Sequence, residues 1–164
     1  MISSRVTTIL FAAMTFVAAQ AQGAGPQLFN FWGEGNGSSG ETGGSLKGSG
    51  QTNLAGTAAV SLTFTNGRLL GQNGSGSGTC SLENGTLQLA TSTGTITMSQ
   101  VGMSCNDAGG GTPNTLNATY LVTQGTGVFQ GVTGTGNLVA GFSSSTGTAT
   151  GLMRLDGVLK QTAP

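Results

Sequence analysis

Alternation of apolar and polar residues with a period of two is the feature that most limits how this chain can fold. Between residues 57 and 65, the even positions Ala58, Val60, Leu62 and Phe64 are all apolar. This spacing is typical of a β-strand with one buried face, and no segment carries a helical stripe of useful length. The same alternation recurs in residues 94–100, 116–123, 136–142 and the final run 147–160.

Two of the Asn-Gly pairs in the chain are candidates for turns between these runs. Asn66-Gly67 precedes Arg68-Leu69-Leu70, and Asn84-Gly85 separates residues 77–83 from residues 86–91. Asn-Gly between two strands is a strong signal for a tight hairpin. We therefore expect antiparallel strands joined by hairpins or short loops.

The segment 33–56 contrasts with the rest of the chain because glycine dominates it. We expect a flexible loop there, with little regular structure except around Leu46. Residues 22–56 would then hold a first strand and this glycine-rich loop, and residues 57–164 the remainder of the same domain. Gly, Thr and Ser together make up 72 of 164 residues, so a helical bundle is excluded.

These patterns predict an all-β fold, a single antiparallel barrel of about eight strands. Closure removes the exposed edges of a sheet, and eight strands leave room for side chains or one small ligand. A β-solenoid would show a fixed repeat, and an outer-membrane barrel would show aromatic girdles, so neither alternative is favoured. The residues expected to line the lumen are Val60, Leu62, Phe64, Tyr120, Val122 and Phe142.

The N-terminal residues resemble an export signal. Arg5 precedes a short apolar stretch, and Ala19-Gln20-Ala21 forms a small-x-small cleavage pattern. The stretch is shorter than the ~20 apolar residues that span a membrane. We expect residues 1–21 to be a signal peptide and the protein to be secreted, either to the periplasm or outside the cell. An oxidising compartment then favours a disulfide between Cys80 and Cys105 over a reactive thiol.

Charge and residue type exclude several functions. The ten charged residues are balanced in sign and scattered, which argues against nucleic acid as a partner. The chain has no His, so a Ser-His-Asp triad and an imidazole metal site are ruled out. We expect no metal or cofactor. Glu34, next to the aromatic residues of the first strand, is the main candidate acid, with Glu83 and Asp156 as others; Asp156 is expected to pair with Arg154 on the exterior.

The segment TYLVTQGTGVFQGVTG, residues 119–134, resembles the corresponding region of the allene oxide cyclases and of the dirigent proteins, which share one barrel fold. The matching residues are Gly125, Gly127, Phe129, Gly131 and Gly134. Weaker similarity is found in Phe64-Thr65-Asn66 and in residues 78–82. Read structurally, the glycines permit a tight turn and Phe129 anchors the next strand.

The resemblance implies an eight-stranded barrel with an apolar lumen. In the cyclases the lumen holds a fatty-acid-derived epoxide, and an acidic side chain and asparagines guide its ring closure; dirigent proteins steer the coupling of phenols. Asn66 matches the turn asparagine and Cys80 matches a strand cysteine, whereas Leu28 stands where the first-strand carboxylate would be.

From these residues we expect a secreted, non-catalytic barrel that binds a small apolar molecule in its lumen. An isomerase or cyclase of the allene oxide cyclase kind is one alternative, with Glu34 and Asn66 as its candidate catalytic residues. A structural protein of an extracellular surface or matrix is the other, with adhesion through the Thr, Ser and Gly side chains of the exterior.

Overall fold

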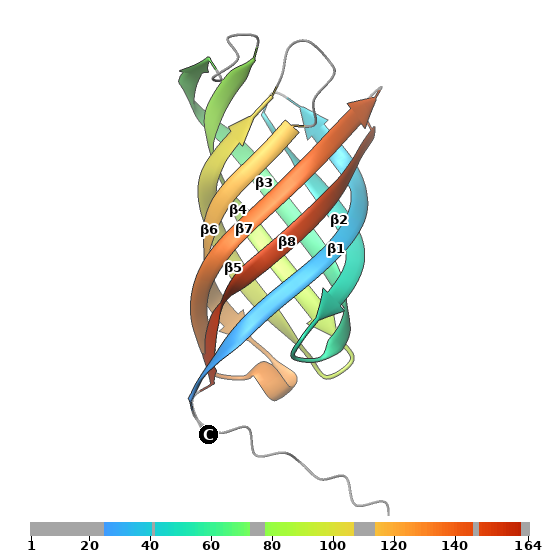
Figure 1. The fold of residues 1–164 in the computed structure, drawn as a ribbon, viewed down its shortest axis with the longest axis vertical. Helices are drawn as coiled ribbons and strands as arrows, with labels where there is room; N and C mark the ends of the chain where they lie inside the picture. The colour runs from blue at the N-terminus through green and yellow to red at the C-terminus, as the bar shows by residue number, and fades with distance from the viewer. Residues whose placement is uncertain (1–24, 41, 73–77, 107–113, 146–147, 162–164) are drawn as a thin grey trace, which may run out of the picture.

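The computed structural model describes residues 25–40, 42–72, 78–106, 114–145 and 148–161. The expected signal peptide, residues 1–21, lies outside the described residues. Eight strands and one short 3-10 turn follow each other along the chain (Figure 1). Their bounds are β1 Pro26–Gly40, β2 Gly43–Thr52, β3 Gly56–Gln72, β4 Thr79–Thr91, β5 Gly94–Cys105, β6 Asn114–Gly125, η1 Gly127–Phe129, β7 Val132–Ser145 and β8 Thr148–Gln161.

The strands form a closed antiparallel barrel in which each strand pairs with its neighbours in sequence. β1 and β8 close the ring through a continuous ladder that runs from Pro26↔Lys160 to Gly37↔Ala149. Figure 1 shows these two strands side by side, inclined to the long axis of the barrel. The prediction of an all-β, eight-stranded antiparallel barrel is confirmed, and the β-solenoid is excluded. Within the described residues, none of the helices has the length and apolar character to cross a membrane.

The core lies inside the barrel and receives apolar side chains from all eight strands. The alternation identified in the sequence fixes which residues point inward. On β3, Ala58, Val60, Leu62 and Phe64 are all buried. On β6 and β7 the inward apolar residues are likewise buried, namely Leu116, Ala118, Tyr120, Val122, Leu138, Ala140 and Phe142.

The glycine-rich segment 33–56 is not the flexible loop that its composition suggested. β1 and β2 pair without interruption from Phe31↔Thr52 to Gly40↔Gly43. Glycines occupy inward positions here, and a Cβ on either Gly33 or Gly50 would lie 2.6 Å from the ring of Phe31. Glycine therefore leaves room for a core aromatic ring, and the cost of glycine in a strand is offset by ladder pairing on both sides.

Neither Asn-Gly pair forms the hairpin turn that the sequence suggested. Asn66-Gly67 lies inside β3, where the register with β4 shifts after Asn66, and Asn84-Gly85 lies inside β4. A type I′ turn needs positive φ at both central residues, and neither glycine is among the positive-φ glycines. A Cβ at Gly85 would instead collide with the backbone oxygen of Thr63, so close strand packing explains this glycine.

The motif in residues 125–134 forms the turn between β6 and β7. Gly127, with φ of 60°, begins the 3-10 turn η1, and Gly131, with φ of 74°, follows it. Phe129 is buried against the core. The backbone N–H of Val128 donates to the Thr93 oxygen at 3.1 Å, which ties the turn to the neighbouring β4–β5 connection. The motif thus has the structural role expected from its residues.

Cys80 and Cys105 form the predicted disulfide. They are direct register partners on β4 and β5, with Cα atoms 4.1 Å apart. The next pair in the ladder, Ser81↔Ser104, points to the opposite face of the sheet, towards the interior. The disulfide therefore ties two strands together next to one end of the barrel.

Replacement of Phe129 by Ala should destabilise the fold. The side chain is 7% exposed and is the large apolar residue that the η1 turn buries. Truncation of a buried Phe commonly costs ~3–5 kcal/mol, whereas Val128→Ala, at a side chain 53% exposed, should change the free energy of unfolding by less than about 0.5 kcal/mol. Denaturant unfolding of both variants checks this; equal stability of the two would contradict it.

Candidate functional site

The six residues expected to line the lumen are all buried, but they pack against one another and against the rest of the core. The rings of Phe64 and Phe142 lie 5.9 Å apart at their centroids. Phe29 and Tyr120 make an edge-to-face contact at 6.5 Å. The centre of the barrel is therefore a packed core, and two of the six, Phe64 and Phe142, line an open pocket.

That pocket lies at the end of the barrel where β3 ends and β4 begins, and we call it the mouth pocket. It has a volume of about 570 Å³. Phe64, Phe142 and Leu69 supply its apolar lining. Amides, hydroxyls and glycines supply the rest, and these are Asn66, Ser81, Ser104, Asn106, Asn114, Thr79, Gly40 and Gly67. The mouth pocket can thus accept a small molecule that is apolar on one side and forms hydrogen bonds on the other.

Asparagine side chains hold the rim of the mouth pocket to the ends of the strands. The Asn66 Nδ2 group donates to the Gly40 oxygen at 3.1 Å, which joins β3 to the end of β1. The Asn106 Oδ1 atom accepts from the backbone N–H of Thr79 at 2.9 Å and from its hydroxyl at 2.8 Å. These bonds fix the positions of polar groups around the opening, as a preformed site requires.

A buried carboxyl lies directly behind this rim. Glu83 points inward from β4 and is only 1% exposed. Its register partners are Asn66 on β3 and Gly102 on β5. The Gln100 Nε2 group donates to Glu83 Oε1 at 3.4 Å, and the Ser104 side chain also hydrogen-bonds to the carboxyl. Because Ser104 lines the mouth pocket, it links the pocket to the carboxyl.

Burial dominates the chemistry of Glu83. Loss of hydration raises its pKa from 4.5 to about 7, against the smaller opposing effect of the bonds from Ser104 and Gln100. Among the described residues, Glu83 Oε2 and Gln100 Oε1 have no hydrogen-bond partner. A carboxyl with this pKa is about half protonated near neutral pH, so it can both donate and accept a proton.

Tyr120 is a second buried polar group, deeper in the core. Burial, with a smaller contribution from the Asp156 carboxylate, raises the pKa of Tyr120 to about 12, so the phenol stays neutral. Its hydroxyl lies against Gly136 and Gly157, where a side chain would displace it. Within the described residues the hydroxyl has no hydrogen-bond partner. Tyr120 does not line the mouth pocket.

The first-strand residues singled out in the sequence lie elsewhere. Phe29 and Phe31 point into the core, and the alternation of β1 therefore directs Trp32 and Glu34 outward. Glu34 lines a hollow on the outer face and not the mouth pocket. Leu28, placed by the resemblance at the position of a catalytic carboxylate, is 78% exposed on the exterior.

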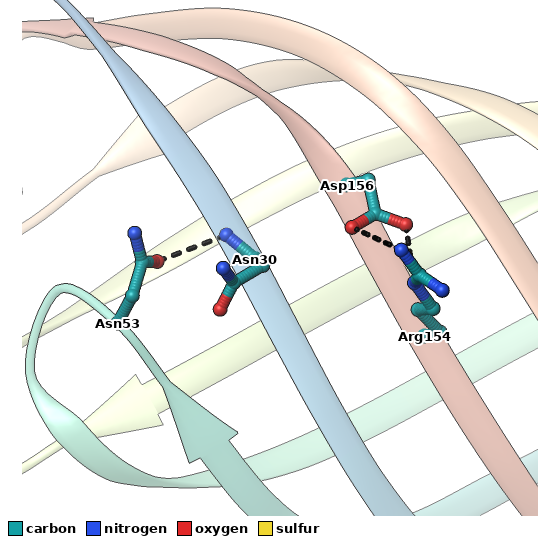
Figure 2. Close-up of polar contacts among 4 residues, drawn as sticks. All are labelled: Asn30, Asn53, Arg154 and Asp156. Carbon is teal, nitrogen blue, oxygen red and sulfur yellow. Dashed lines mark hydrogen bonds and ion pairs between the residues drawn. The ribbon is translucent and has the colours of Figure 1, made fainter.

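The structure brings together only part of the predicted site. Asn66 and Glu83 are direct neighbours, whereas Asn66 and Glu34 are not. The expected Arg154–Asp156 ion pair is present on the outer face of β8, with Nε and Oδ2 2.6 Å apart (Figure 2). Among the described residues, no group of three or more His, Cys, Asp or Glu side chains could hold a metal ion.

Comparison with known proteins adds no family to these observations. No protein-family model, no curated protein and no solved structure matches the chain. The similarity to the allene oxide cyclases and dirigent proteins therefore stays a prediction from residues 119–134 and the two shorter segments.

Stability should fall as pH rises, because the pKa of Glu83 is higher in the folded than in the unfolded protein. The contribution of the protonated Glu83 carboxyl to the free energy of unfolding is complete below pH 4.5 and is lost as pH rises through about 7. We expect the free energy of unfolding to decrease by roughly 3 kcal/mol between pH 4.5 and 8. Denaturant unfolding across this range measures it.

Glu83→Gln should remove most of this pH dependence, since an amide does not titrate. Glu34→Gln is the matched control, because it deletes an exposed carboxylate and should leave the dependence intact. An unchanged pH profile in Glu83→Gln would show that another group is responsible.

Proposed function

We propose that this protein is an exported β-barrel that binds a small amphipathic molecule at the mouth pocket without transforming it. The observation that carries the proposal is the mouth pocket itself, where Phe64, Phe142 and Leu69 face a set of amides and hydroxyls. An apolar body would pack on the two phenyl rings, and a hydroxyl or carbonyl group of the ligand would bond to the rim.

Two further observations support this proposal. The disulfide next to the mouth is compatible with an oxidising compartment, as the expected export requires. Core packing below Phe64 and Phe142 leaves the mouth, and not the centre of the lumen, as the place for a ligand. The apolar ligand expected from the sequence would therefore bind at one end of the barrel.

Titration with a fluorescent fatty acid, cis-parinaric acid, should show saturable binding to the mature protein. Ser81 points into the mouth pocket, so Ser81→Tyr should fill it and weaken binding at least about tenfold. Thr119→Tyr adds the same side chain on the exposed face of β6 and should bind like the parent protein. Absence of saturable binding by the parent, or equal binding by Ser81→Tyr, would contradict the proposal.

A cyclase of the allene oxide cyclase kind is the second candidate, and Glu83 is the observation that favours it. Its carboxyl has a pKa of about 7 and is joined through Ser104 to the mouth pocket. A carboxyl in this state can protonate an oxygen that forms during ring closure. Glu83, and not Glu34, would be the acid in this case, with Asn66 beside it on β3.

The two candidates differ in the stereochemistry of the product. With a fatty-acid allene oxide as substrate, a binding protein without catalysis should leave the cyclised product racemic, and this is the result we expect. An enantiomeric excess that Glu83→Gln abolishes and Glu34→Gln preserves would establish the cyclase instead. Chiral chromatography of the product distinguishes these outcomes.

A further inference from the structure

The outer face of β2, β1 and β8 carries two adjoining hollows that the mouth pocket does not involve. One, of about 520 Å³, lies around Trp32. The other, of about 670 Å³, lies around Glu34 and Asn36. Both cross β2, β1 and β8, which are adjacent in the barrel, and the second hollow also reaches Gly141 and Ser143 on β7. They follow each other along β1, so we treat them as one feature and call it the outer groove.

Trp32 lines the first hollow. It is the only tryptophan of the chain, and it is 58% exposed on the outer face of β1. Its register partners are Gln51 on β2 and Arg154 on β8. The indole ring is therefore flanked on both sides by long side chains that carry planar, hydrogen-bonding groups.

The polar groups around Trp32 are held by bonds that the structure shows. The side chain of Asn53 accepts from the Asn30 backbone N–H at 2.9 Å and donates to the Leu28 oxygen at 2.9 Å. Figure 2 shows the first of these bonds together with the Arg154–Asp156 ion pair on the adjacent strand. The ion pair has two contacts, of 2.6 and 3.1 Å, although both side chains are largely exposed.

The second hollow continues the groove towards the mouth end of the barrel. Its floor is formed largely by glycines, including Gly141, which leaves open space where a side chain would project outward from β7. Glu34, Asn36 and Ser49 supply its hydrogen-bonding groups. From Asn30 to Asn36 the groove extends for about 20 Å along β1, which is long enough for several linked sugar rings.

We propose that the outer groove binds a neutral oligosaccharide chain. A sugar ring has an apolar C–H face that packs on an exposed indole, and hydroxyls around its edge that bond to amides, carboxylates and guanidinium groups. Trp32 supplies the exposed indole. The groups that would bond to the sugar hydroxyls are the side chains of Gln51, Arg154, Asp156 and Glu34. Aromatic rings are well suited to this because they give a large contact area with little loss of conformational entropy.

Charge selects the class of sugar. Arg154 is already paired with Asp156, and Glu34 on β1 is offset by Lys47, the exposed register partner of Asn36 on β2. The groove therefore offers no excess of positive charge to bind an anionic polymer such as a polyuronate or nucleic acid. An uncharged chain does not need such an excess.

Fluorescence of Trp32 reports directly on the groove, because no other tryptophan contributes. The mature protein, with its disulfide intact, is titrated separately with cellohexaose, laminarihexaose, maltohexaose and mannohexaose, and with hexagalacturonate as the anionic comparison. We expect a saturable change with at least one neutral hexasaccharide and weaker or absent binding of hexagalacturonate. Calorimetry with the same sugar then gives affinities for variants.

Trp32→Ala should weaken binding of that sugar at least about tenfold, and Trp32→Phe, which retains a ring, should weaken it less. Leu121→Ala is the matched control, because it truncates a side chain that is 58% exposed on the outer face of β6. Ser81→Tyr should bind the sugar normally, so this test is independent of the mouth pocket. No response to any neutral probe, binding of hexagalacturonate that is equal or tighter, or full affinity in a folded Trp32→Ala protein would overturn the proposal.

Discussion

Pairing of β1 with β8 is the interaction on which the rest of the structure depends. It joins the first strand to the last and turns an eight-stranded sheet into a ring without edges. Ordinary sheets protect their edges with charged residues, and this chain has only ten charged residues. Closure provides the protection that the composition lacks. It also fixes the interior as a space that is only wide enough for side chains.

That limited interior explains the glycines of β1 and β2. Two aromatic side chains of β1, Phe29 and Phe31, point inward, and further large side chains in the same layer would exceed the space available. Glycines at Gly33 and Gly50 provide room for the Phe31 ring. Hydropathy carries no signal for glycine, so a regular strand pattern of alternating glycine and polar residues resembles a loop. The period-two alternation of glycine with polar residues is the feature of this segment that indicates a strand.

Long-range strand pairing outweighs local turn chemistry at the Asn-Gly pairs. Apolar alternation predicted the inward faces of β3, β6 and β7 correctly, because burial in a closed barrel rewards that pattern directly. Asn84-Gly85 is a good turn sequence, yet the strand continues through it. The reason is tertiary: Gly85 packs against Thr63, and the Thr65 hydroxyl donates to the Asn84 side chain at 2.9 Å across the ladder. Neither neighbour is visible from the sequence around the pair.

The alternation of inward and outward residues along each strand also explains how much of each site could be predicted. Leu87 and Leu89 point inward on β4, and the same alternation, continued through Asn84-Gly85, places Glu83 inside the barrel. A turn at Asn84-Gly85, as the sequence suggested, would have ended the strand before Glu83. On β1 the same rule, applied from Phe31, sends Trp32 and Glu34 outside, although their aromatic neighbours in sequence suggested an apolar setting. Each strand of a closed barrel thus contributes to two unrelated surfaces. The inner surface holds the Glu83 carboxyl of β4 behind the mouth, and the outer surface holds the Trp32 indole of β1 and the Arg154–Asp156 ion pair of β8. Because the packed core separates them, a ligand on one face need not affect the other.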